Sequence, residues 1–198
     1  MENLLLDTLP EIVKIDGREY FVDTCFRAMI VFEQVINDIS LSGEQKVRES
    51  LEIFYTDKIP RNTLAAFEQL ILFYSCGKKP EKKQPKKNGE VTIKERRIYD
   101  FVQDAPYIYS AFLSQYGIDL NEIEYLHWWK FDALFRGLND DQKIIKIMGY
   151  RSADLSEIKN SKERSRMAKL KHMFSLEQNL TVEDKIAMAG SAFAGGFK

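Results

Sequence analysis

Apolar residues recur every three or four positions through most of the first 76 residues, which is the pattern of amphipathic helices. The pattern predicts three helices, at about residues 26–39, 43–55 and 62–76. Pro60 separates the second helix from the third, because the residue before a proline is pushed out of the helical conformation. Gly77 is expected to end the third helix.

Residues 11–23 differ, because apolar and polar side chains alternate there on both sides of Asp16-Gly17. This dipeptide tolerates the positive φ angles of a tight turn, so the segment predicts a small β-hairpin. A lone hairpin is only marginally stable in water. We therefore expect it to lie against the helices that follow.

The helical pattern continues in the second half of the chain. Residues 93–103 predict one helix. A second helix is expected to begin with Asp104 as its N-cap and to end at Gly117. Asp119 is expected to cap a long central helix that reaches Leu138. The apolar face of this helix is so broad that it needs neighbours on more than one side. We therefore expect it to be the hub of the core.

Three shorter helices are predicted beyond it. Asn139 starts the first, with Asp140 and Asp141 in the opening turn, where the helix dipole favours negative charge. A basic amphipathic helix covers residues 162–175, and a helix rich in small residues follows within residues 177–198. That last helix either packs on its own domain or serves as a docking peptide.

These elements predict a mainly α protein, a helical bundle with a small N-terminal β-hairpin. Of the 198 residues, 44% are apolar, which is enough for a real core. The predicted division has four parts: a hairpin plus three-helix unit at 1–77, a flexible Lys/Pro-rich loop at 78–92, a helical core with the Trp-rich central helix at 93–176, and a C-terminal helix and tail at 177–198.

Charge is balanced overall but unevenly distributed. The formal net charge of −1 argues against a protein that coats nucleic acid by bulk charge. Residues 78–97 nevertheless contain nine basic and three acidic side chains. This segment is either a solvated linker or an electrostatic hook for nucleic acid or an acidic protein surface. It holds no aromatic side chain on which bases could stack, which disfavours single-stranded nucleic acid.

Few residues suggest chemistry. Cys25 and Cys76 are too far apart for a metal motif and are expected to be buried free thiols, and the two histidines, His127 and His172, have no metal-ligand spacing. Nucleophile elbows and phosphate-binding glycine loops are missing from the sequence. We expect no catalytic site, no metal and no cofactor. The first residues, MENLLLDTLPE, lack the basic start and long apolar core of a signal peptide, and no apolar run approaches the roughly 20 residues of a membrane span. We therefore expect a cytosolic protein.

The aromatic cluster His127-Trp128-Trp129 is the most conspicuous feature of the central segment. Three consecutive helix positions spread over about 200° of the circumference, so at least one ring should lie near the surface or at an interface. Large rings with an N–H group are frequent interface anchors. Packing of the cluster into the core is the alternative.

The cluster lies in a stretch that resembles a known family. The resemblance rests on residues 125–160, YLHWWKFDALFRGLNDDQKIIKIMGYRSADLSEIKN, and on the basic helix KERSRMAKLKHMFSL that follows. It extends more weakly over the hairpin-plus-helix opening and the segment from Tyr99 to Tyr116. The family consists of small helical proteins encoded just upstream of the tape measure protein in the tail gene clusters of long-tailed phages (siphophages) and prophages of Gram-positive bacteria.

This resemblance implies a non-enzymatic tail assembly chaperone. Such a protein coats the tape measure protein in many copies, helps recruit tail-tube subunits, works in the cytoplasm of the bacterial host and leaves before the virion is complete. The interpretation is compatible with aromatic and basic side chains acting as partner contacts. The candidates are Trp128, Trp129, Phe135, Tyr150, Arg151, Arg164 and Lys169.

A second hypothesis is a nucleic-acid-binding accessory protein. It would use the Lys-rich loop and the basic helix, and its binding would weaken steeply with added salt. The balanced overall charge makes nucleic acid the less favoured partner. A membrane is not expected to be a partner.

Overall fold

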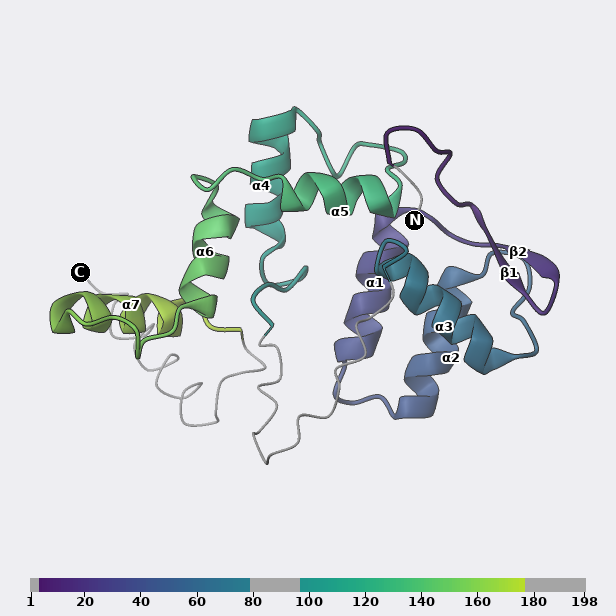
Figure 1. Cartoon of the computed structure of the whole chain (residues 1–198), viewed down its shortest axis with the longest axis horizontal. Helices are drawn as coiled ribbons and strands as arrows, with labels where there is room; N and C mark the ends of the chain where they lie inside the picture. The colour runs from purple at the N-terminus through teal and green to yellow at the C-terminus, as the bar shows by residue number, and fades with distance from the viewer. Residues whose placement is uncertain (1–3, 79–96, 177–198) are drawn as a thin grey trace, which may run out of the picture. The chain divides into compact units, whose positions relative to one another are not determined.

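The structure, a computed structural model, describes residues 4–78 and 97–176 (Figure 1). The predicted loop at 78–92 beyond Lys78, the start of the predicted helix at 93–103 and the predicted C-terminal helix and tail lie outside the described residues. Within the described part, the mainly α fold with an N-terminal hairpin is confirmed. The elements are β1 (Ile12–Ile15), β2 (Arg18–Phe21), α1 (Phe26–Asn37), α2 (Gly43–Phe54), α3 (Thr63–Tyr74), α4 (Ala105–Tyr116), α5 (Trp128–Arg136), α6 (Lys143–Ser152) and α7 (Ser161–Met173).

The chain divides into two compact units. Unit 1 comprises residues 1–90 and 118–137, and therefore holds the hairpin, α1, α2, α3 and α5. Unit 2 comprises residues 91–117 and 138–198, with α4, α6 and α7. The predicted division placed the Trp-rich helix with the C-terminal half, whereas the structure places α5 in the N-terminal unit.

The hairpin forms as the alternating pattern predicts. β1 pairs antiparallel with β2, with Ile15 opposite Arg18 and Ile12 opposite Phe21. The turn residues Asp16 and Gly17 have φ angles of 49° and 75°, which this dipeptide tolerates. The inner face is buried against the unit, and β1 contacts α3. The expected packing of the hairpin on the helices is confirmed. The buried residues of that face are Val13, Ile15 and Tyr20.

Local capping sets the helix boundaries in unit 1. The Ser42 hydroxyl accepts a hydrogen bond from the Gln45 N–H (3.2 Å), and the Gln45 side chain accepts one from the Ser42 N–H (2.8 Å), which makes a capping box at the start of α2. The side chain of Asn62 caps α3 in a similar way. After α3, Cys76 and Gly77 have positive φ angles of 53° and 73°, so the helix cannot continue through them.

The prediction of one helix from Asp119 to Leu138 is wrong, because α5 begins only at Trp128. Asp119 caps a single turn, in which the Ile123 N–H donates to the Asp119 carbonyl (2.9 Å). The guanidinium of Arg27, on α1, then donates to the carbonyls of Leu120 (2.9 Å) and Ile123 (2.7 Å). These carbonyls would serve the next helical turn, so Arg27 holds the segment in a non-helical path.

α5 nevertheless packs at the centre of unit 1. The Phe131 ring stacks on the Phe26 ring of α1, with centroids 4.9 Å apart. The Phe26 N–H donates to the Leu126 carbonyl (2.9 Å), and the Trp128 N–H donates to the Thr24 carbonyl (2.7 Å). These backbone bonds tie the entry of α5 to the entry of α1.

Two local predictions in unit 2 are wrong. Residues 97–103 form an irregular segment and a turn instead of a helix. The Asp100 carboxylate accepts hydrogen bonds from the N–H groups of Val102 (2.7 Å) and Gln103 (2.8 Å). These side-chain bonds compete with the backbone bonds of a helix. Asp140 and Asp141 lie in the turn before α6 and not in its first turn, since the helix starts at Lys143.

The other helix boundaries in unit 2 agree with the predicted pattern. Gly117 ends α4 in the left-handed conformation, with φ of 67°. Asn160 caps α7 by accepting from the N–H groups of Lys162 (2.9 Å) and Glu163 (3.1 Å). Asp104 sits at the N-cap position of α4, but its side chain makes no capping bond.

Candidate functional site

The aromatic cluster at the start of α5 is buried. Trp128 and Trp129 are only 3% and 8% exposed, and His127 is 3% exposed. No ring of the cluster lies near the surface of unit 1, so the alternative prediction, packing into the core, is the one that the structure shows. The reason is that the three residues are not consecutive helix positions. His127 is extended and pairs with Cys25 in an isolated β-bridge, so the cluster turns into unit 1.

Both indole N–H groups bind the C-terminal end of α3. Trp128 Nε1 donates to the Tyr74 carbonyl and Trp129 Nε1 to the Phe73 carbonyl, each at 2.8 Å. The last carbonyls of a helix have no partner within the helix, and the two tryptophans supply one. A partner protein could reach these rings only if unit 1 opened. The structure therefore assigns Trp128 and Trp129 a structural role.

His127 forms the N-cap of α5 with its ring. Nδ1 accepts from the Trp129 N–H (3.1 Å), so the proton lies on Nε2, which is 3.3 Å from the Pro10 carbonyl. Burial lowers the pKa of His127 below its ordinary 6.5, and the charge of Lys130 acts in the same direction. The Pro10 carbonyl and Glu11 oppose this shift. The folded protein therefore holds His127 neutral.

A pH dependence of stability follows from this lowered pKa. Below its ordinary pKa the unfolded chain binds a proton that the folded chain does not, so the free energy of unfolding should fall as the pH drops from about 7.5 to about 5.5. His127→Asn keeps a capping acceptor but cannot titrate, and should flatten this part of the profile. Urea unfolding at several pH values measures it, with His172→Asn as the matched control. An unchanged slope in His127→Asn would contradict the assignment.

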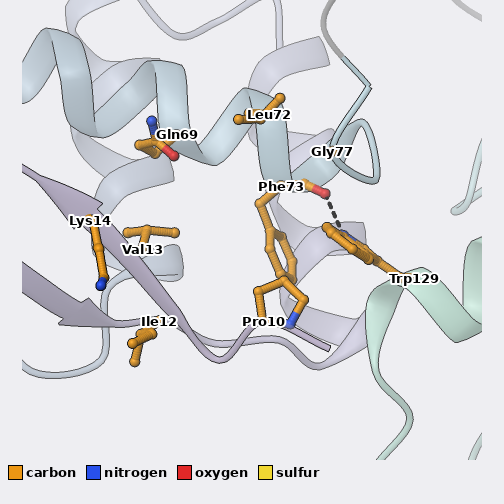
Figure 2. Close-up of a pocket in the computed structure, with 9 residues that line it drawn as sticks. All are labelled: Pro10, Ile12, Val13, Lys14, Gln69, Leu72, Phe73, Gly77 and Trp129. Atoms are coloured by element: carbon orange, nitrogen blue, oxygen red, sulfur yellow. Dashed lines mark hydrogen bonds between the residues drawn. The ribbon is translucent and has the colours of Figure 1, made fainter. Parts of the chain in front are cut away.

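A groove lies beside the cluster in unit 1. It has a volume of about 290 Å³ and runs between β1, the last turns of α3 and the Trp129 ring (Figure 2). Apolar side chains dominate its lining, with Lys14 and Gln69 as the polar members. A Cβ at Gly77 would lie 3.4 Å from Trp129 Cη2, so the end of α3 approaches the indole closely. The apolar lining is Pro10, Ile12, Val13, Leu72, Phe73 and Trp129.

Sequence reasoning missed this groove. The β1 wall lies about 60 positions before the α3 wall and about 115 positions before Trp129 in the sequence. No local sequence pattern connects these three segments. The only signal was the expectation that the hairpin lies against the helices. That expectation placed β1 near α3 without revealing an unfilled space between them.

In unit 2, Arg151 is a structural residue at 4% exposed. Its guanidinium donates two bonds to the Asp104 carboxylate, at 2.5 and 2.9 Å, and two more to the carbonyls of Ile98 (3.0 Å) and Phe174 (2.5 Å). Asp104 is 1% exposed as a side chain. The pair therefore joins α4, α6 and the end of α7, and Arg151 has no surface to offer a partner.

The remaining candidates divide by exposure. Phe135 is 5% exposed and stacks on Phe131, so it belongs to the core of unit 1. Tyr150 is half-buried, with its ring 5.8 Å from the Phe174 ring. Arg164 and Lys169 are exposed on α7. Of the seven candidates, only these last three present atoms to solvent.

α7 is the most solvated helix of the described residues. None of its thirteen residues is buried. Its C-terminal end is held to unit 2, because the Arg151 guanidinium binds the Phe174 carbonyl and Lys171 donates to the Ala153 carbonyl. Leu176 follows, 3% exposed. The first two turns, residues 161–166, are exposed throughout.

No three His, Cys, Asp or Glu side chains among residues 4–78 and 97–176 come together as a metal site. Cys25 and Cys76 are free and half-buried, not buried as expected. Burial and the neighbouring Asp132 raise the pKa of Cys76 to about 12, so its thiol stays protonated at neutral pH. No helix in the described part of the chain is long and apolar enough to cross a membrane.

The family model described as Bacteriophage Gp15 protein matches residues 5–176, which include both units and exclude the C-terminal tail. No curated protein and no solved structure matches the chain.

Proposed function

Because the chain belongs to the Bacteriophage Gp15 protein family, we propose that it is a non-enzymatic tail assembly chaperone of a long-tailed phage or prophage. In this role it binds the tape measure protein in the cytoplasm of a Gram-positive host and helps recruit tail-tube subunits. It leaves before the virion is complete.

The observation that carries the proposal is the family match over residues 5–176, because it covers the same stretch on which the resemblance to tail assembly chaperones rests. The described residues are compatible with a binding protein. They offer an open groove in unit 1 and a basic helix in unit 2 whose first two turns are exposed throughout.

Many copies acting on one tape measure chain would suit such surfaces. Each contact can be weak, since repeated contacts along one long partner give high overall avidity. The proposal therefore includes self-association of the chaperone along the tape measure protein.

We assign the partner contact in unit 2 to α7 and the neighbouring Tyr150. Lys162, Arg164, Arg166 and Lys169 are exposed on this helix, and Lys171 stands in its last turn, where positive charge suits the helix dipole. The hydrogen bonds that hold the C-terminal end of α7 to unit 2 fix the position of its exposed first two turns. An acidic stretch of a partner helix is the chemistry that fits it.

Reversing charge on α7 should weaken this contact. The double variant Arg164→Glu/Lys169→Glu is expected to lower copurification of the tape measure protein by roughly tenfold, because it turns attraction into repulsion at two exposed positions. Pull-down from nuclease-treated lysate measures it and removes bridging nucleic acid.

Arg18→Glu/Arg61→Glu is the matched control. It makes the same charge change at two exposed positions of unit 1. If both double variants reduce copurification equally, α7 is not the contact surface.

A further inference from the structure

One face of α7 combines positive charge with an exposed apolar side chain. Lys162, Arg166, Lys169 and Met173 are three or four positions apart in succession, so their side chains share one face of the helix. All four are exposed, and Met173 is 63% exposed although its side chain is large and apolar. We call these four residues the basic face of α7. Its chemistry suits a segment that carries both acidic and apolar side chains.

The chain continues beyond α7 from a fixed point. Leu176, the last described residue, is 3% exposed. The two carbonyls before it are both held by unit 2. The Arg151 guanidinium donates to the Phe174 carbonyl (2.5 Å), and the Gln103 side chain donates to the Ser175 carbonyl (3.0 Å). The sequence that follows therefore starts directly beside the C-terminal end of α7.

That sequence has the charge opposite to that of α7. Residues 177–184, EQNLTVED, contain three acidic side chains and no basic one, and we call them the acidic segment. α7 contains five lysines and arginines and one glutamate. Eight residues can span up to about 26 Å, whereas a helix of thirteen residues is about 20 Å long. The acidic segment is therefore long enough to reach along the whole of α7.

We propose that the acidic segment binds the basic face of α7 in the same copy and covers it until a partner displaces it. Its three carboxylates supply counter-charges for the basic face, and Leu180 and Val182 supply apolar contact for Met173. Exposed ion pairs are individually weak. Because the acidic segment is joined to the end of α7, its effective concentration at the basic face lies in the millimolar range, so weak pairs are sufficient.

The contact makes the partner site on α7 selective. This consequence rests on the proposed function, in which α7 binds an acidic stretch of the tape measure protein. A single acidic peptide must compete with a tethered segment of the same chemistry. A long partner that binds many copies gains avidity and can displace it. The acidic segment therefore disfavours chance acidic partners and favours a long one.

Carbodiimide cross-linking of the purified full chain tests the contact without a tape measure protein. The reagent joins a carboxylate to a lysine amine where the two are in contact. Mass spectrometry maps the links in the monomer fraction at low micromolar protein concentration. The parent chain should give links between the acidic segment and the two lysines of the basic face, Lys162 and Lys169.

Arg166→Glu separates attraction from mere proximity. It keeps both lysines of the basic face but repels the acidic segment, and should lower the yield of the links by at least about fivefold. Arg164→Glu is the matched control, since Arg164 is also exposed on α7. It lies two positions away and therefore about 160° around the helix axis. This control should keep most of the links.

A fluorescently labelled decaglutamate peptide measures the competition. The full chain with all three carboxylates of the acidic segment neutralised should bind this peptide at least about threefold more tightly than the parent chain. The reason is that the parent chain offers an uncovered basic face only part of the time. Fluorescence anisotropy gives both affinities. The neutralised variant is Glu177→Gln/Glu183→Gln/Asp184→Asn.

The matched control neutralises three exposed carboxylates of unit 1 and should bind the peptide like the parent chain. It is Glu52→Gln/Asp57→Asn/Glu68→Gln.

Four results would overturn the inference: a parent monomer without the links, links that form only between copies, equal losses in Arg166→Glu and Arg164→Glu, or a neutralised variant that binds the peptide no more tightly than its control. The proposed function has a separate readout. If the links form but the parent chain does not copurify with the tape measure protein, the proposed function fails and the contact stands.

Discussion

Asp104→Ala is expected to lower the free energy of unfolding of unit 2 by about 3–5 kcal/mol, because it leaves the Arg151 guanidinium buried without a counter-ion. Arg151 is 4% exposed and makes two bonds to Asp104, at 2.5 and 2.9 Å. The Asp104 carboxylate also accepts from the Asp100 N–H (2.9 Å), which fixes the turn before α4. A loss of this size is a large part of the total stability of a typical domain.

Urea unfolding followed by circular dichroism measures this loss, and two variants sharpen it. Glu19→Ala breaks the Lys14–Glu19 pair, whose side chains are 72% and 57% exposed, and should cost less than about 1 kcal/mol. The double variant Asp104→Leu/Arg151→Met removes both charges and should cost clearly less than Asp104→Ala alone. A cost for Asp104→Ala as small as that of Glu19→Ala would contradict the structural role of the pair.

Trp128→Ala is expected to lower the free energy of unfolding of unit 1 by about 3–5 kcal/mol. The Trp128 ring stacks on Tyr74 and on Phe131, with centroids 5.1 and 5.6 Å apart, and its N–H binds the Tyr74 carbonyl. Phe131 in turn stacks on Phe26. Truncation would open a cavity at the point where α1, α3 and α5 meet.

Trp128→Phe separates the two contributions of that side chain. It keeps an aromatic ring but loses the N–H bond to the end of α3, and should cost less than the alanine variant. Phe21→Ala is the control, since Phe21 is 63% exposed, and should change stability by less than about 1 kcal/mol. The same urea series measures all three variants. Equal costs for Trp128→Ala and Phe21→Ala would show that Trp128 does not hold unit 1 together.

The sequence predicts the elements whose cause is local. The hairpin follows from Asp16-Gly17 between alternating residues, and α2 and α3 follow from their spacing and from the caps at Ser42 and Asn62. Each of these devices acts within a few residues. Their boundaries could therefore be read within one or two positions.

The errors have distant causes. The long central helix fails because Arg27, more than 90 residues away, takes the carbonyls of Leu120 and Ile123. Asp104 resembles a helix cap in the sequence, but Arg151 uses its carboxylate. Neither partner can be identified from residues near the affected segment.

The candidate site shows the same limit. A pair of tryptophans in sequence indicates either an interface or a core, and only the α3 carbonyls at 2.8 Å assign these two to the core. The groove required the folded unit, because a cavity volume is a property of the packing. The exposed basic helix α7, in contrast, could be identified from its charge pattern.

The proposed function requires that this chain keep a long tape measure protein in solution during tail assembly. Co-expression of the chain with its proposed partner, a phage tape measure protein, tests this requirement, followed by size exclusion with light scattering. The long protein should appear in the soluble fraction only in the presence of this chain, in a complex that holds many copies of it. A long protein that stays insoluble while this chain elutes alone would contradict the chaperone role.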